Sequence, residues 1–272
     1  MLLLIHDDGS TDRTVSIIRE YEKKTPSVHL LDGKHIGYPK CFEHLWRNSP
    51  KAEFYAFSDQ DDVWLPEKLS RAITQLRQRS QDERLLYCAQ REIVGPDLEP
   101  LGVEEVKPQK GIMINFLFPN AAGGSAMVFN ENMRQFLCKG HLENGQYHDS
   151  WIYKLTDLCG TFIYDEHKVI LYRQHGEQTV GYAPDFFGRL TRLGRRILSG
   201  QKKRKMDATY QEVIVKDYRE DLSEEQLQLL ETMVRAKNSW SARWKLLNTP
   251  GIPLWPVPDY LFRKLRILLG RV

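Results

Sequence analysis

The first half of the chain alternates short apolar runs with amphipathic stretches. Short runs rich in β-branched and aromatic residues are typical of strands, and apolar residues three or four apart are typical of helices. Strands that alternate with helices favour a mostly parallel α/β sheet. The pattern predicts strands at Leu2–Ile5, Val28–Leu31, Phe54–Ser58 and Arg84–Val94, and helices at Thr14–Tyr21, around Phe42–Trp46 and from Pro66 to Leu76.

The pattern changes in the C-terminal third, which is helix-rich and shows no clear strand from about Asp185 onward. We therefore predict an α/β domain at residues 1–183 and a helical, basic region at residues 184–272. The sequence contains no internal repeat and no low-complexity tract.

Composition places the chain among ordinary globular proteins. Its 272 residues are 41% hydrophobic and 28% charged, which excludes disordered, collagen-like and coiled-coil classes. No apolar run reaches the ~18 residues that a membrane span needs. The four cysteines form no CxxC pair, so they indicate neither a disulfide framework nor a zinc site, and they fit a reducing compartment.

The formal charge of +3 conceals an uneven distribution. Residues 186–205 hold eight Lys and Arg, and residues 260–272 hold four more, with no acid in either segment. Without those twelve, 27 basic residues face 36 acidic ones, a net charge of −9. An acidic body therefore carries a basic C-terminal region.

Three carboxylates follow directly after the strand predicted at Phe54–Ser58, in the segment FYAFSDQDDVW. Alternation along an extended backbone places Asp59 and Asp61 on one side, close enough to share a divalent cation, with Asp62 beside them. Mg²⁺ and Mn²⁺ prefer such oxygen ligands. The alternative is a solvated acidic turn. An EF-hand is excluded because the loop lacks Gly at its sixth position and Glu at its twelfth.

A second acidic loop, HDDGSTD at His6–Asp12, follows the first predicted strand. Helix capping accounts for Thr11 and Asp12. It does not account for Asp7 and Asp8, which are expected at the same sheet edge as the other acidic loop. One of these two aspartates is expected to accept hydrogen bonds from a nucleotide base or to bind a ligand hydroxyl.

Together the two loops resemble those of family 2 glycosyltransferases with a GT-A fold. The resemblance continues through NAAGGSAMVFN (Asn120–Asn130), HDSW (His148–Trp151) and YRQHGEQTVG (Tyr172–Gly181). These blocks are similar to the bacterial rhamnosyltransferase-like branch that builds surface polysaccharide. The resemblance implies the fold of nucleotide-diphospho-sugar transferases, an α/β fold with a Rossmann-like mixed sheet flanked by helices and, here, a helical C-terminal extension.

The resemblance implies roles for the acidic residues in the chemistry. Asp59 and Asp61 match the DxD metal motif, with Asp62 beside it, and would hold Mg²⁺ or Mn²⁺ against the donor diphosphate. Asp149 of HDSW occupies the place of the catalytic base. The implied reaction is a metal-dependent, inverting sugar transfer, in which a carboxylate takes the acceptor's proton while a nucleotide diphosphate leaves.

The resemblance also implies a donor-binding set. Asp7 matches the aspartate that contacts the nucleotide base, with Asp8 its neighbour, and His175 lies where a residue approaches the diphosphate or the metal. Asp59 and Lys40 complete this expected set. The expected partners are a dTDP- or UDP-sugar, with rhamnose as the favoured sugar, and a saccharide or lipid-linked saccharide acceptor.

Each of these residues also has a structural alternative. Asp149 could cap the helix that contains Trp151, and Trp151 itself is expected in the core rather than as a sugar-stacking platform. His175 could be a hydrogen-bonded turn residue. Gly123 and Gly124 could let the backbone approach a sugar, or could only mark the start of a strand.

The sequence departs from the family pattern at His6, Cys41 and Gln178, where Ser, Asn and Asn are usual. Compared with the family, it also opens after the first strand and its base-binding loop, so we expect that unit to be missing. Losing an interior strand would expose a sheet edge and remove donor contacts. The alternative function is therefore that of a truncated, non-catalytic remnant that binds a membrane or partners.

The basic segments favour a membrane surface. In Phe186–Leu198 apolar residues recur at helical spacing between arginines, and the polybasic run Lys202–Lys205 follows. This pattern is typical of an interfacial helix on anionic lipid; a helix packed on the domain is the alternative. The acidic body and the lack of a recognition motif argue against nucleic acid. We expect a cytoplasmic protein, peripheral at the inner face of the plasma membrane.

Overall fold

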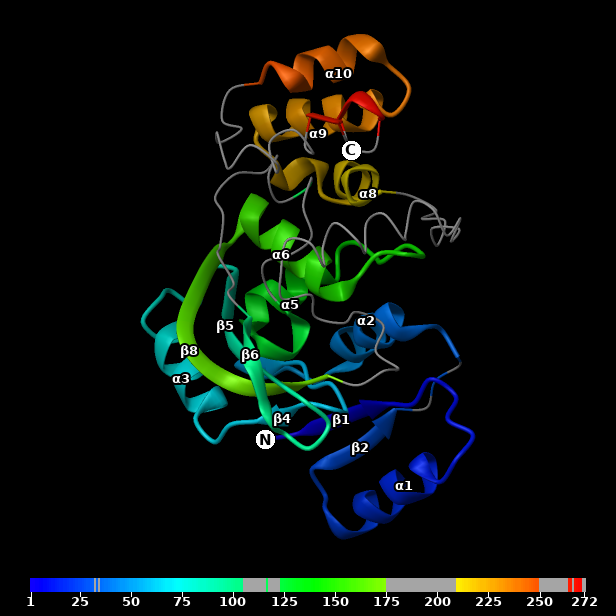
Figure 1. Ribbon diagram of the computed structural model, residues 1–272, viewed down its shortest axis with the longest axis vertical. Helices are drawn as coiled ribbons and strands as arrows, with labels where there is room; N and C mark the ends of the chain where they lie inside the picture. The colour runs from blue at the N-terminus through cyan, green and yellow to red at the C-terminus, as the bar shows by residue number, and fades with distance from the viewer. Residues whose placement is uncertain are drawn as a thin grey trace.

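Figure 1 shows the computed structural model of the chain, which describes residues 1–31, 33, 35–104, 116, 123–174, 209–249, 264–265 and 267–270. The strands are β1 (Leu3–His6), β2 (Val28–Leu31), β3 (Phe54–Ala56), β4 (Val63–Trp64), β5 (Leu85–Val94), β6 (Pro100–Glu104), β7 (Met127–Asn130) and β8 (Thr161–Arg173). The helices are α1 (Thr14–Lys24), α2 (Tyr38–Asn48), α3 (Lys68–Leu76), α5 (Glu131–Leu137), α6 (His148–Cys159), α8 (Tyr210–Asp217), α9 (Glu224–Ala236) and α10 (Trp240–Leu247), with 3-10 turns η1 (Gly124–Ala126) and η2 (Arg219–Asp221).

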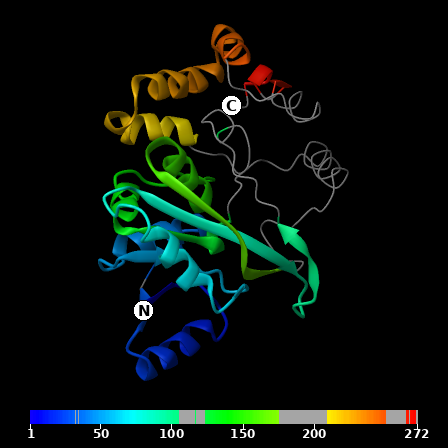
Figure 2. The same cartoon turned by 90° about the vertical axis from the view of Figure 1, so that its left-hand side faces the viewer.

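The main sheet has six strands in the order β3-β7-β5-β8-β4, and β6 pairs with β5. β5 is its central strand, and eight of its ten residues are buried because both faces of the sheet are covered along it. Its first half pairs with β7 and its second half with β6, both antiparallel, while β8 runs parallel along its other edge. Figure 2 shows β5 and β8 crossing the molecule side by side.

This pairing corrects one prediction and confirms another. Among the described strands of the main sheet, β5 and β8 form the one parallel pair, so the expectation of a mostly parallel sheet is wrong. The predicted strands end at Val94 and therefore leave out β6, β7 and β8, which take part in every antiparallel pair of the main sheet. The mixed sheet implied by the family resemblance is confirmed.

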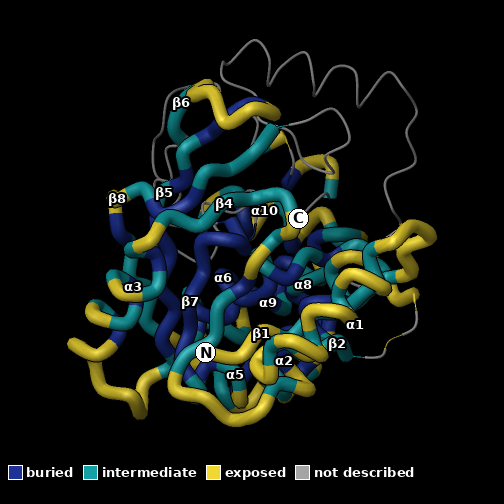
Figure 3. Tube along the Cα trace, turned by 90° about the horizontal axis from the view of Figure 1, so that it is seen from below, coloured by how far each residue is buried: buried dark blue, intermediate teal, exposed yellow. Residues whose placement is uncertain are grey.

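The N-terminal residues form a βαβ unit apart from the main sheet. β1 and β2 pair in parallel, from Leu3 opposite Val28 to His6 opposite Leu31, and α1 connects them. α1 has no buried residue, and Figure 3 shows this unit as largely exposed. The following helix, α2, contacts β1 and places Phe42 and Trp46 in the core. α2 therefore joins the N-terminal unit to the rest of the protein.

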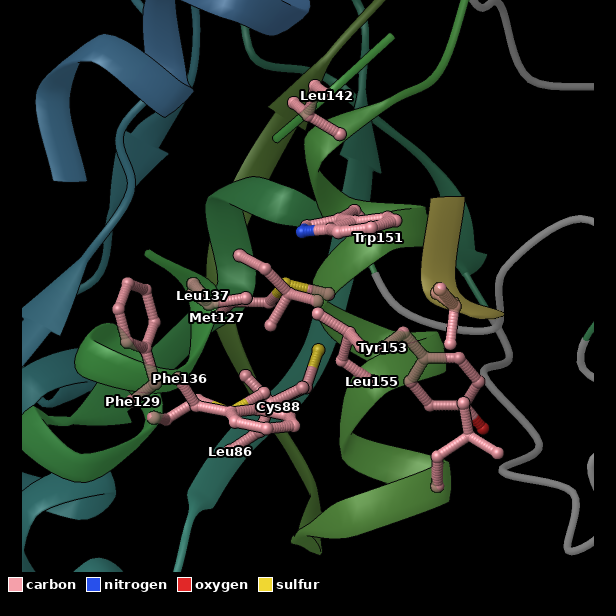
Figure 4. Packing of buried hydrophobic residues seen from close by; sticks show 14 of the residues in the cluster. Leu86, Cys88, Met127, Phe129, Phe136, Leu137, Leu142, Trp151, Tyr153 and Leu155 are labelled. Carbon is pink, nitrogen blue, oxygen red and sulfur yellow. The ribbon is translucent and has the colours of Figure 1, made fainter. Parts of the chain in front are cut away.

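One continuous hydrophobic core lies between the main sheet and the helices α5 and α6, and it extends into α8 and α9. Figure 4 shows Trp151, Tyr153 and Leu155 of α6 packed in this core near Met127 and Leu137. Beyond α6, Tyr218 lies against Trp151 with ring centroids 5.7 Å apart. The described part of the C-terminal region, 209–249, is helical and contains no strand, as expected.

Some sequence predictions fall outside the part of the chain that the structure describes. The boundary between residues 183 and 184, the basic segment 186–205 and His175 all lie there, as do most of residues 260–272. Within the described residues, no helix combines the length and the apolar character needed to cross a bilayer.

Candidate active site

The acidic loop between β3 and β4 is held in place by its two flanking strands. β3 pairs with β7, and β4 pairs with the last third of β8, where Val63 lies opposite Leu171. This register brings the loop to the end of β8. There the backbone N–H of Arg173 donates to Asp62 Oδ1 at 3.2 Å, and its Nε donates to the backbone carbonyl of Asp61 at 3.0 Å. The second carboxylate oxygen of Asp62 is buried and has no hydrogen-bond partner.

The carboxylates of this loop repel one another. Burial raises the pKa of Asp59 to about 6, and the charges of Asp62 and Asp61 add to the effect, while Arg91 opposes it. Burial likewise raises the pKa of Asp62. Crowded, partly desolvated carboxylates are stabilised as anions by nearby positive charge, which a divalent cation supplies. The three carboxylates therefore fit Mg²⁺ or Mn²⁺ in the type of ligand atom that they offer. Their oxygen atoms converge less closely than the possible metal-ligand atoms of His6, Asp8 and Cys41.

Two buried basic side chains lie next to the acidic loop, and sequence reasoning missed both. Lys68 of α3 is 1% exposed, and its Nζ donates to the carbonyls of Phe57 at 3.3 Å and Ser125 at 2.6 Å. Burial lowers its pKa to about 6, against the pull of Asp59 and Asp62. Lys68 thus ties the end of β3 to η1. The sequence signal for the burial of Lys68 is its helical spacing with Ala72 and Leu76, the other buried residues of α3.

Arg91 is the second buried basic side chain next to the acidic loop. It lies in β5, with its guanidinium 4.2 Å from the ring centroid of Tyr172. A Cβ placed on Gly123 would come within 2.1 Å of the guanidinium carbon, so the missing side chain at Gly123 makes room for Arg91. The sequence signal is the polar triplet Gln90–Glu92 inside a strand whose other residues are mostly apolar, LLYCAQREIV.

Asp149 lies in the first turn of α6, half-buried, where its carboxylate accepts a hydrogen bond from the backbone N–H of Ser150. Its charge contributes to the raised pKa of Asp59, which places it in the electrostatic neighbourhood of the acidic loop. Burial and the charges of Asp59 and Asp149 also raise the pKa of Tyr38, the first residue of α2. The start of α2 and the start of α6 therefore border the acidic loop together.

His148 fixes the beginning of α6. It is buried, stacks on Phe42 with ring centroids 3.9 Å apart, and meets Phe57 and Tyr38 edge-on. Neither ring nitrogen has a hydrogen-bond partner. A Cβ on Gly124 would lie 2.4 Å from Nε2, so Gly124 allows the imidazole to sit against the backbone. Burial lowers the pKa of His148 to about 4, and the residue is neutral at pH 7.

His148 predicts acid sensitivity of the fold. The unfolded histidine binds a proton below about pH 6.5 and the folded one only below about pH 4, so acidification between these values favours unfolding. The shift corresponds to about 3 kcal/mol of unfolding free energy. We expect His148→Phe, which keeps the aromatic stack, to gain stability relative to the unmodified chain as the pH falls from 6.5 to 4. Urea unfolding of both proteins across this range measures the difference, and a difference independent of pH would contradict the assignment.

The loop after β1 turns its two aspartates in different directions. Asp7 Oδ2 accepts from the backbone N–H groups of Gly9 and Ser10, each at 3.0 Å, and the hydroxyl of Ser10 is the main cause of its lowered pKa. Asp8 instead reaches the residues before α2 and accepts from the N–H groups of Ile36 at 2.6 Å and Gly37 at 3.0 Å.

Asp12 and Lys40 also lie near this loop, whereas Trp151 lies in the core. Asp12 Oδ1 accepts from the N–H of Thr14 at 2.9 Å, and so binds the first N–H group of α1 from the position before its N-cap, Arg13. Lys40 lies in the first turn of α2, close in sequence to the Gly37 that Asp8 contacts. Trp151 is fully buried, as expected for a core residue. The structure thus places Asp8 and Lys40 around the start of α2, and Asp59, Asp61, Asp62 and Asp149 around the neighbouring acidic loop.

Comparison with known proteins identifies the fold and shows similarity to one family. Residues 3–103 match the model of glycosyl transferase family 2. The dTDP-rhamnosyl transferase RfbG of Shigella flexneri is 27% identical over 206 residues, which cover 71% of this chain and 69% of RfbG. The crystal structure of residues 1–349 of TarS from S. aureus superimposes with a TM-score of 0.51 at 15% identity, over 99% of this chain and 72% of that one. The chain is therefore similar to glycosyltransferase family 2 over residues 3–103 and has the GT-A fold.

Proposed function

We propose that this glycosyltransferase carries out a metal-dependent, inverting transfer of a sugar from a nucleotide-diphosphate donor to a saccharide or lipid-linked saccharide acceptor. The observation that carries the proposal is the proximity of the acidic loop to the first turn of α6, where the charge of Asp149 contributes to the raised pKa of Asp59. Two kinds of carboxylate function, cation binding and proton abstraction, are then available within one site.

Asp59, Asp61 and Asp62 would hold Mg²⁺ or Mn²⁺. The unpartnered oxygen of Asp62 and the raised pKa of Asp59 both indicate carboxylates whose negative charge is not fully balanced by Arg91. A bound divalent cation would neutralise the charge that develops on the leaving diphosphate. Lys68 and the backbone of Arg173 hold the loop from beneath and from the side, so the carboxylates keep their positions before a donor arrives.

Asp149 would act as the general base. Its carboxylate would take the proton of the attacking acceptor hydroxyl, and the new bond would form on the face of the sugar opposite the departing diphosphate, which inverts the anomeric configuration. The buried, neutral His148 beside it holds the first turn of α6 in place without adding a competing charge. Asp149 therefore needs no local rearrangement to meet an acceptor.

Asp7, Asp8, Lys40 and His175 would bind the donor, the aspartates toward the nucleotide and the cations toward its diphosphate. The 27% identity with a dTDP-rhamnosyl transferase favours dTDP-rhamnose over a UDP-sugar. The basic segments at residues 186–205 and 260–272 favour an anionic membrane surface, at the inner face of the plasma membrane, as the place where a lipid-linked acceptor is met.

Donor binding with and without metal tests the proposal. Titration with dTDP-rhamnose in the presence of Mg²⁺ or Mn²⁺ should give saturable binding, and excess EDTA should abolish it because the diphosphate would then face uncompensated carboxylates. UDP-glucose serves as the matched competitor for nucleotide and sugar preference. Absence of saturable binding with every donor and metal would contradict the proposal and favour a non-catalytic remnant.

A further inference from the structure

A second cluster of metal-ligating side chains lies outside the acidic loop, between the end of β1 and the start of α2. His6, Asp8 and Cys41 each offer one ligand atom, and these atoms all lie within 4.8 Å of one another. Among the described residues this is the one group of three or more such side chains that converges in this way. Two of its members, His6 and Cys41, are positions where the sequence departs from the family pattern.

The imidazole of His6 provides an independent sign that a ligand is expected here. Its side chain has no exposed surface, yet neither ring nitrogen has a hydrogen-bond partner. Its Nε2 lies 4.0 Å from Asp8 Oδ1. A Cβ on Gly33 would lie 1.9 Å from the ring, so the backbone of Gly33 closes one side of it. Leaving two buried polar atoms without a partner costs free energy, which a bound cation would offset.

The other two ligands are held by the backbone around the start of α2. Asp8 is fixed by the N–H groups of Ile36 and Gly37, which both donate to its Oδ1. Cys41 is 9% exposed, and its thiol donates weakly to the carbonyl of Gly37 at 3.4 Å. Since Gly37 and Cys41 are one helical turn apart, the same turn positions both the carboxylate and the thiol.

We propose that His6, Asp8 and Cys41 form a zinc site. Imidazole, carboxylate and thiolate together are ligands of Zn²⁺, whereas Mg²⁺ prefers oxygen alone. Zinc bonds of ~2.0–2.3 Å separate tetrahedral ligand atoms by ~3.3–3.8 Å, so the three groups have to close by about 1 Å. A water molecule would take the fourth position.

The site would add a metal link between two parts of the fold that already pack together through β1 and α2. His6 and Asp8 belong to the end of the N-terminal βαβ unit, whose α1 has no buried residue. Cys41 belongs to α2, whose Phe42 and Trp46 lie in the main core. Zinc bound between them would fasten the exposed unit to the core and stabilise the folded state by mass action.

Co²⁺ spectroscopy, supported by Zn²⁺ titration, tests the site on the full chain. Co²⁺ bound to a thiolate gives a ligand-to-metal charge-transfer band, so the unmodified chain should show this band with saturation at one ion, and Zn²⁺ should displace it. The band should disappear in both Cys41→Ser and Cys41→Ala. In His6→Gln we expect Zn²⁺ affinity to fall by at least ~10-fold.

Matched controls separate this site from the acidic loop. Cys138→Ser removes another thiol and Asp61→Asn removes a carboxylate of the proposed Mg²⁺ site, and both should keep the band. Two Cys41 variants are used so that the test stands if one of them fails to fold, and the metal-free melting temperature verifies folding for each. Absence of the band in the unmodified chain, or its persistence in a folded Cys41 variant, would overturn the proposal. The readout does not involve sugar transfer. Asp8 is shared with the proposed donor-binding residues, and zinc bound to Asp8 would leave the nucleotide contact to Asp7.

Discussion

Asp149→Asn is expected to lower kcat for sugar transfer by ~10²–10⁴-fold, the usual contribution of a positioned general base. Asn has nearly the same shape and can still accept the hydrogen bond from the N–H of Ser150, but it cannot take a proton from the acceptor hydroxyl. Donor affinity should change little, because Asp149 lies at the start of α6 and not among the proposed donor-binding residues. Initial rates and donor titration on the same preparation separate the two effects.

The control for this prediction is Asp97→Asn, which removes one negative charge from an exposed position between β5 and β6. It should leave kcat unchanged, since it alters net charge without touching the site. Normal turnover in Asp149→Asn would remove Asp149 from the mechanism. Loss of donor binding along with turnover would instead indicate a structural role at the start of α6.

Trp151→Ala is expected to lower the free energy of unfolding by about 3–5 kcal/mol, the range for a large buried aromatic. Trp151 has no exposed surface and lies where α6 meets the C-terminal helices, with Tyr210 and Tyr218 against it. Truncation leaves a cavity at this junction, and close packing allows only partial collapse. Urea denaturation, monitored by circular dichroism, gives the difference directly.

Trp244→Ala is the matched control, because it removes the same side chain from α10, where it is 70% exposed. Its effect should lie within about 0.5 kcal/mol. Equal losses in the two variants would contradict a continuous core between α6 and α8. A large loss in Trp151→Ala alone would show that the C-terminal helices depend on packing against the α/β portion.

The sequence predicted well those features that depend on neighbouring residues. β2 has the predicted bounds, and β5 differs from its predicted range by one residue. The helix predicted around Phe42–Trp46 extends from Tyr38 to Asn48. Its start is set by Gly37 before it and by Pro39 in its first turn, and the spacing of apolar residues does not report these two signals. The contact of Asp12 with the start of α1 was likewise foreseeable, since the side chain and its partner are two residues apart.

Strand pairing was not foreseeable in the same way. β5 takes β7 on part of one edge and β6 on the rest, a division that depends on where the chain returns after long connections. Apolar periodicity reports which face of a strand is buried and not which strand lies beside it. The prediction of a mostly parallel sheet failed for this reason.

For the candidate site, the sequence by itself determined the candidate residues that stand in short continuous segments: the acidic loop Asp59–Asp62, the loop at Asp7 and Asp8, and Asp149 in the family motif. Only the tertiary structure decided which groups surround them. Lys68 and Arg91 reach the acidic loop from α3 and β5, and His6 meets Cys41 across more than thirty residues of sequence. Electrostatic and metal-ligand contacts depend on distance in space, and folding alone brings such distant residues within reach of one another.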